Sequence, residues 1–156
     1  MIEYQTIKWL HIVSSMLLFG TGLGTAFFKY TADLSGNLAA IAETNRRVVL
    51  ADWLFTTPTI IIQPLTGYLL ARLAGWPLAA PWLMWSIALY LLAGLCWLPV
   101  VRLQIRMRDD STAALAAHSD LPERYREDCR QWFWLGVPAF FAMLGVLYLM
   151  TAKAPF

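Results

Sequence analysis

The sequence predicts an all-α fold, a bundle of four transmembrane helices. Composition is the first reason, because 59% of the 156 residues are hydrophobic and 14% are charged, whereas a soluble domain carries about 25% charged residues. The second is that four stretches carry no formal charge and reach the ~18 residues that mark a membrane span. These stretches are Trp9–Phe28, Trp53–Ala71, Leu73–Val101 and Gln131–Ala152. The whole chain, 1–156, is therefore expected to form a single integral membrane domain.

The helices themselves are expected at residues 5–28, 48–73, 81–107 and 131–152. The third charge-free stretch also holds the turn before its helix, because Gly75, Pro77 and Pro81 do not fit one continuous helix. Residues 38–47 are expected to form a short helix that runs into the second span. Asp109-Asp110-Ser111 is expected to cap a separate short helix before the fourth span. Asp52 is expected to form a local ion pair with Arg47.

The charges outside the spans predict the orientation of the bundle. Nine cations fall in the two longer loops and three near the termini or the short turn. The positive-inside rule then places the longer loops in the cytoplasm and both termini outside, which is the periplasm for a bacterial inner membrane. The loop cations are Lys29, Arg46, Arg47, Arg102, Arg106, Arg108, Arg124, Arg126 and Arg130, and the others are Lys8, Arg72 and Lys153. With a net charge of +2, the expected partner is the lipid bilayer and not a nucleic acid.

His11 is the candidate functional residue, because it lies about two turns inside the first span. Ionisable groups within a membrane are rare and mark functional sites by default, although a structural histidine bonded to a neighbouring carbonyl or hydroxyl is the alternative. Ser14 continues a polar stripe beside it, and Gln63 and Ser86 are expected to point toward the same region. Neutral imidazole binds heme iron, and helix bundles build cofactor sites between facing helices.

The sequence offers several candidates for a second axial ligand. The other histidine, His118, falls in a loop on the opposite side of the membrane, so a heme held by two histidines of one chain is not expected. Met84, Met143 and Met150 each reach a depth near that of His11, and His/Met ligation of heme is chemically reasonable. Methionine is more often core filler, so the identity of any second ligand stays open.

Gly20 and Gly24 form a GxxxG ridge on the first span. Such a ridge lets another helix approach closely, so it predicts helix packing or a homo-oligomer. A flat macrocycle or a quinone would exploit the same close approach. The two cysteines, Cys96 and Cys129, have no zinc-type spacing and are expected to be free thiols.

Four segments, "LHIVSSMLLFGTGLGTAFF", "RRVVLADWLFTTP", "PWLMWSIALYLLAG" and "WLGVPAFFAMLGVLYLM", resemble in this order a bacterial family of integral membrane proteins, domain of unknown function family 2269. More distantly, the order is similar to the HemJ protoporphyrinogen oxidases and the CopD-like copper-resistance proteins. The HemJ resemblance implies a HemJ-like four-helix fold and heme b bound through His11. Arg47, Thr57-Pro58 and Val137-Pro138 match further HemJ positions.

The third span departs from the HemJ pattern. Where that family has "WLHxK", this chain reads "WLMWS", so Met84 and Ser86 replace a histidine and a lysine. Loss of the lysine puts porphyrinogen oxidation in doubt, and whether the chain is an enzyme, an oxidoreductase of HemJ type, stays open.

The leading hypothesis is a heme b-binding membrane redox protein with His11 as axial ligand, acting in electron transfer or in a porphyrin or quinol redox step with a quinone or a membrane redox partner. One alternative is copper handling of CopD type by His11 and soft ligands, which would be Met84, Met143, Met150 and Cys96. Another is a non-enzymatic membrane subunit or assembly factor without a cofactor.

Overall fold

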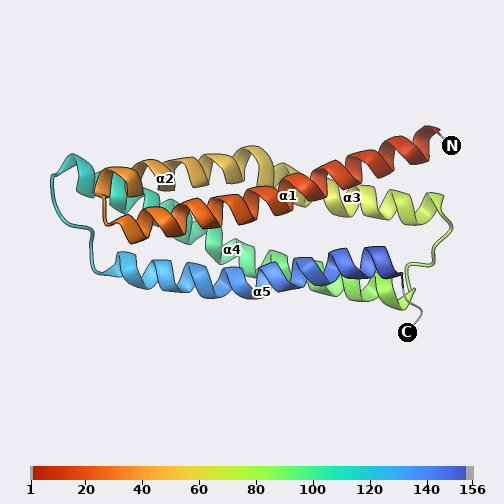
Figure 1. The fold of residues 1–156 in the computed structure, drawn as a ribbon. Coiled ribbons are helices and arrows are strands. Elements are labelled where there is room, and N and C mark those ends of the chain that lie inside the picture. Colours follow the sequence, from red (N-terminus) through yellow and green to blue (C-terminus); the bar gives the residue numbers. More distant parts are fainter. Residues whose placement is uncertain (1, 154–156) are drawn as a thin grey trace.

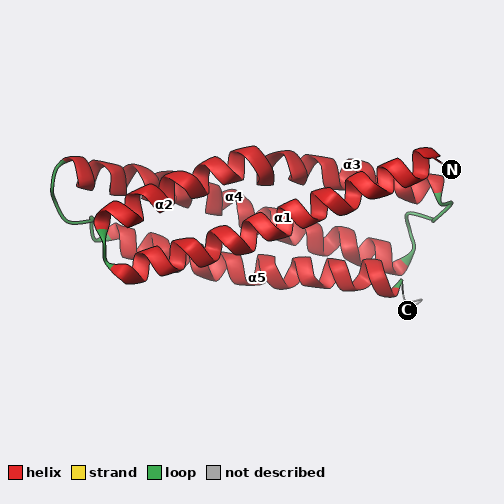
Figure 2. Cartoon of the chain, turned by 45° about the horizontal axis from the view of Figure 1, so that its top comes forward, coloured by secondary structure: helices red, strands yellow, loops and turns green. Residues whose placement is uncertain are grey.

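Four long helices make up the chain in the computed structural model, which describes residues 2–153. They are α1 (Ile2–Ser35), a composite helix of α2 (Leu38–Ala51), η1 (Asp52–Thr56) and α3 (Thr57–Leu73), then α4 (Pro81–Ala116) and α5 (Arg124–Ala152) (Figure 1). No strand occurs in the described range, and only short loops join the helices (Figure 2). Each of the four is long and apolar enough to cross a membrane. The predicted all-α fold with four membrane-spanning helices is confirmed.

Gly36 and Asn37 form the connection at which α1 ends and α2 begins. Gly36 has φ +64°, a left-handed conformation that costs glycine little. The side chain of Asn37 then caps α2 by accepting hydrogen bonds from the backbone N–H groups of Ala39 and Ala40, at 3.0 and 3.2 Å. The expected short helix after this loop is therefore present, and it continues without a break into the second span.

The expected cap at Asp109-Asp110-Ser111 is wrong, because α4 runs through these residues to Ala116. The Ser111 hydroxyl is fully buried and donates to the Met107 carbonyl at 2.7 Å, within the same helix. Asp110 pairs with Arg124 of α5. Because Ser111 bonds within α4 and Asp110 pairs with α5, neither side chain caps a new helix, and α4 continues past them.

A π-helical turn, η1, separates α2 from α3. Pro58 has no N–H, and its ring would collide with the carbonyl four residues earlier in a regular α-helix. The backbone N–H of Thr57 instead bonds to the carbonyl of Asp52, five residues back. This wider turn accommodates the proline and turns Asp52 and Thr56 inward, so that both are buried.

The bundle consists of two helix pairs. In one pair α1 packs against α2, η1 and α3, and in the other α4 packs along α5, with α2 also contacting α4. Gly145 of α5 lies close against α4, where an added Cβ would lie 2.8 Å from Cδ1 of Leu89. An added Cβ at Gly20 or Gly24 would meet nothing within 4 Å. The predicted ridge is thus not used by any described helix of this chain.

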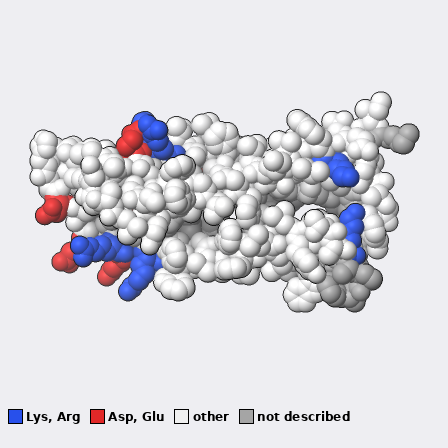
Figure 3. Space-filling view, viewed as in Figure 1, with Lys and Arg blue, Asp and Glu red and all other residues white. Residues whose placement is uncertain are grey.

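Both termini of the described chain and the α3–α4 turn lie at one end of the bundle, called here the terminal end, and the α1–α2 and α4–α5 connections lie at the other, the loop end (Figure 1). Charged side chains gather at these two ends and leave the middle of the visible face without charge (Figure 3). Many large apolar side chains along the helices are exposed. That distribution is what a lipid environment requires of a membrane-spanning bundle.

Candidate functional site

His11 meets polar side chains of α3 inside the bundle. Its Nδ1 lies 2.7 Å from Oγ1 of Thr66. Gln63 donates from Nε2 to the His11 carbonyl and to the Ser14 hydroxyl, both at 2.9 Å. Gly67 lies against the ring, because an added Cβ there would be in van der Waals contact with Cε1 of His11, at 3.4 Å. The sequence-predicted partners Ser14 and Gln63 therefore surround His11, and Thr66 is the direct partner of the ring.

The hydroxyl of Thr66 determines which nitrogen of His11 carries the proton. Thr66 donates its own proton to the Ile62 carbonyl at 2.7 Å, so its oxygen is free to accept. With the Thr66 proton on the Ile62 carbonyl, Nδ1 of His11 donates to Thr66 and Nε2 keeps its lone pair. A hydrogen bond that fixes Nδ1–H in this way is the usual second contact of a metal-binding histidine.

The other predicted ligands are spread over the bundle. Met84 is 56% exposed on the outside of α4. Ser86 is buried, but its hydroxyl donates to the Trp82 carbonyl one turn earlier in its own helix. Met150 packs against the apolar cluster at the terminal end, and Met143 lines a separate cavity. Among residues 2–153, no three His, Cys, Asp or Glu side chains gather in a group that would hold a metal ion. Both cysteines are free thiols, as expected.

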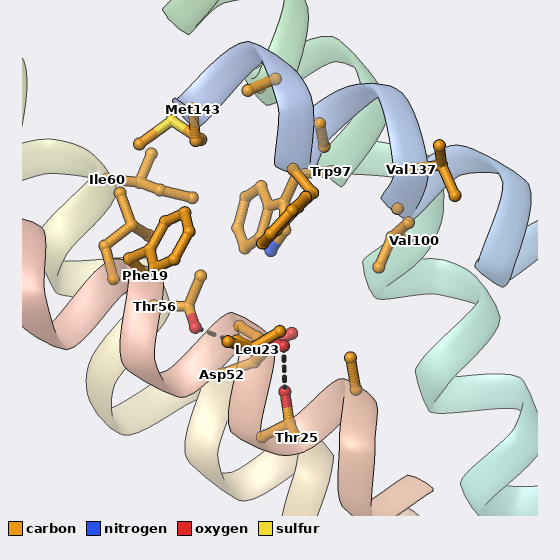
Figure 4. A pocket seen from close by; sticks show the side chains of 18 of the residues that line it. Phe19, Leu23, Thr25, Asp52, Thr56, Ile60, Trp97, Val100, Val137 and Met143 are labelled. Atoms are coloured by element: carbon orange, nitrogen blue, oxygen red, sulfur yellow. Dashed lines mark hydrogen bonds between the residues drawn. The ribbon is translucent and has the colours of Figure 1, made fainter. Parts of the chain in front are cut away.

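The cavity that Met143 lines has a volume of about 450 Å³ and is bounded by α1, η1, α3, α4 and α5. Apolar and aromatic side chains form most of its wall, and His11 is not part of it. Figure 4 shows Trp97 and Met143 on one side of the space and Asp52 and Thr56 on the other. Sequence reasoning did not find this cavity.

The expected ion pair between Asp52 and Arg47 is wrong. Arg47 and Arg46 both bind Glu43, and their hydrogen bonds lower the pKa of Glu43 to about 2. Asp52 is turned inward by η1 and is only 7% exposed. Its Oδ1 accepts a hydrogen bond of 2.8 Å from Thr56.

A second polar cluster near the loop end was also missed by the sequence. Lys29 is 1% exposed, although it was expected in a loop. Its Nζ donates to Oδ2 of Asp33 at 2.8 Å and to the Tyr125 hydroxyl at 3.3 Å. It also lies 5.2 and 5.5 Å from the ring centroids of Tyr125 and Trp132. These side-chain contacts join α1 to α5, two helices whose backbones make few close contacts with each other.

Asn45 extends this cluster to α2 and α4. Its Nδ2 is placed to donate to the Tyr125 hydroxyl at 2.8 Å, to the Ser111 hydroxyl at 3.1 Å and to the Met107 carbonyl at 3.3 Å. Tyr125 in turn donates to Oδ1 of Asp33 at 2.8 Å. One network of buried polar groups therefore holds all the helices together at the loop end. The i, i+4 spacing of Lys29 and Asp33 was the one signal in the sequence.

Cys129 borders the same network and lies outside the charge-free part of α5. Burial raises the pKa of its thiol to about 11. In a Cys96→Ser background, we therefore expect labelling of Cys129 by a water-soluble maleimide to be slow at neutral pH, because the thiolate is the reactive form. The rate should keep rising toward pH 11, whereas an ordinary thiol levels off above its pKa of about 8.5. Rapid labelling at pH 7 would contradict the buried position.

Comparison with family models identifies one that matches residues 5–154 and describes a predicted integral membrane protein, DUF2269. The chain belongs to this family. The match covers all four DUF2269 helices, including His11, the cavity and the Lys29 network. Neither the curated proteins nor the solved structures include one that matches this DUF2269 chain. The similarity to HemJ and CopD therefore rests on the sequence motifs alone.

Proposed function

We propose that this DUF2269 protein is a membrane redox protein that binds heme b through Nε2 of His11. The observation that carries the proposal is the hydrogen bond of 2.7 Å between Nδ1 of His11 and Thr66. Because the Thr66 proton goes to the Ile62 carbonyl, the lone pair of His11 lies on Nε2, which makes no hydrogen bond with the described residues. A neutral imidazole held in this tautomer is a suitable axial ligand.

Among the described residues, His11 would be the one ligand to the iron, without a methionine as a second. Met84 is largely exposed and Met150 is packed into the terminal-end cluster. Met143 faces the cavity that His11 does not line. We therefore expect iron with a single protein ligand, which would be high-spin. Heme would supply one-electron redox chemistry, while the chain holds the imidazole in one tautomer and one orientation.

No oxidation of a specific substrate is part of the proposal. Ser86 stands where the HemJ pattern has a lysine, and its hydroxyl is engaged with Trp82. Copper handling has less support than heme, because one of its candidate ligands, Met84, faces outward. The role of a helper subunit without a cofactor is the outcome left if heme does not bind.

A visible spectrum of the protein purified in mild detergent tests the proposal. The wild type should show a Soret band and a high-spin spectrum when oxidised, and His11→Ala should lose the band. The matched control is His118→Ala, which removes the histidine at the loop end and should leave the spectrum unchanged. Thr66→Val should weaken heme retention by about 10–100-fold, the usual effect of losing the second contact of a ligating histidine. Absence of a Soret band, or its survival in His11→Ala, would refute the proposal.

A further inference from the structure

Three residues that line the cavity each carry a buried polar atom without a hydrogen-bond partner. Within residues 2–153, the buried side-chain atoms that lack a partner are Oδ2 of Asp52, Nε1 of Trp97 and Nε1 of Trp132. All three residues line the same cavity, although they come from η1, α4 and α5. Buried polar groups are nearly always paired, so each such atom requires an explanation. Their shared location indicates a missing polar partner inside the cavity.

The chemistry of that partner follows from Asp52. Thr56 donates to Oδ1 and so leaves Oδ2 as the free oxygen. The side chains of Trp97 and Gln104 lie beside the Asp52 carboxylate. Neither of them makes a hydrogen bond with Oδ2. An indole N–H only donates, so the unpaired Nε1 of Trp97 near the Asp52 carboxylate favours an acceptor there. A hydroxyl group fits both needs, because it donates to Oδ2 and accepts from Nε1 of Trp97.

The rest of the cavity suits an aromatic, apolar molecule. Its volume of about 450 Å³ is within the range of 300–1,000 Å³ that is typical of small-molecule sites. Phe19, Tyr90, Phe140 and Trp132 contribute aromatic walls. Added Cβ atoms at Gly94 and Gly136, which also line it, would meet nothing within 4 Å, so the space beside them is open.

The cavity reaches the apolar surface of the bundle. Leu23 of α1 and Phe133 and Phe141 of α5 belong to its wall, yet they are 52%, 47% and 65% exposed. A molecule dissolved in the bilayer would therefore enter from the side, between α1 and α5.

We propose that this cavity binds a quinol, with one ring hydroxyl between Asp52 and Trp97. Trp132 offers a further donor for the second ring oxygen. The apolar tail of the quinol leaves through the opening between α1 and α5. Because His11 does not line the cavity, this site is separate from the proposed heme ligand, and its test is a binding measurement that does not depend on heme.

Titration calorimetry of the full chain in lipid nanodiscs tests the proposal with two matched probes. Decylubiquinol, kept reduced, should bind saturably with one site per chain. Its dimethyl ether retains the ring and the tail but has no hydroxyl proton for Asp52. We expect the dimethyl ether to bind about 10–100-fold more weakly than the quinol, because it leaves the buried Oδ2 of Asp52 without a donor. Oxidised decylubiquinone, which also lacks the donor, should likewise bind more weakly than the quinol.

Asp52→Asn tests the hydrogen bond itself. Thr56 should hold the amide oxygen at the position of Oδ1, so that the NH₂ group replaces the free Oδ2 and donates into the cavity. The preference should then reverse, with oxidised decylubiquinone binding more tightly than the quinol. A merely structural role of Asp52 would change both affinities in the same direction.

Gly136→Leu tests the location, because it fills open space in the cavity and should abolish quinol binding. Gly24→Leu is the matched control, since Gly24 also has open space but does not line the cavity. The proposal is overturned if quinol and dimethyl ether bind equally, if Gly136→Leu binds as the control does, or if no saturable binding occurs. It is also overturned if a copurified phospholipid occupies the cavity and decylubiquinol does not displace it.

Discussion

Replacement of Lys29 by methionine should lower the free energy of unfolding by about 3–5 kcal/mol, the usual cost of removing one partner of a buried ion pair. The Lys29 side chain is 1% exposed, and Asp33 is left without its cation when it is removed. The thermal midpoint of the protein in detergent, followed by circular dichroism, should fall by about 6–20 °C. Methionine keeps the length and most of the apolar stem, so the loss measures the charge and its hydrogen bonds.

Two further variants identify the cause of that loss. Asp33→Asn combined with Lys29→Met removes the unpaired carboxylate while the amide oxygen still accepts from Tyr125, so more than half of the lost stability should return. Arg46→Met breaks a pair whose arginine is 64% exposed, and it should leave the midpoint unchanged, as exposed ion pairs contribute little. An unchanged midpoint in Lys29→Met would show that the network does not hold α1 to α5.

Asn45→Leu should lower the free energy of unfolding by about 2–3 kcal/mol. Leucine has nearly the same shape but cannot donate to Tyr125, Ser111 or Met107, and their buried oxygens lose a donor. Asn45→Asp should be worse, because a carboxylate would face the same acceptors. The measurement is the same thermal midpoint, and if Asn45→Leu proves neutral, these bonds contribute no net stability. Asn37→Ser is the control, since serine retains the capping oxygen at an exposed site.

The fold was predictable because its signal is one of composition and length. Each charge-free stretch is long enough to cross the bilayer as a helix, and a helix pairs all of its backbone groups within the segment. The structure has one helix for each stretch. The partners of His11 were partly predictable for a similar reason. Polar side chains in a membrane must meet one another, so Ser14 and Gln63 had few alternatives to the histidine.

The Lys29 network and the cavity were not predictable in the same way. Hydropathy ends the first span at Phe28, and the next residues are charged, so Lys29 was assigned to a loop. The structure extends α1 by two turns and buries the lysine against Tyr125, Cys129 and Trp132 of α5. The cavity depends on how four helices are rotated about their axes, and no local pattern in the sequence reports that rotation. Asp52 illustrates the point, because its burial follows from a π turn that hydropathy does not detect.

That π turn has a consequence for how the family should be aligned. Each residue of an α-helix turns the chain by about 100°. A π turn closes with one residue more than an α turn, so removing one residue from η1 would restore a regular turn and leave Gln63, Thr66 and Gly67 facing α1. The composition of the second span would hardly change. A family member one residue shorter at this point would keep the partner of its histidine, whereas the loss of one residue within α3 before Gln63 would rotate Thr66 away from it.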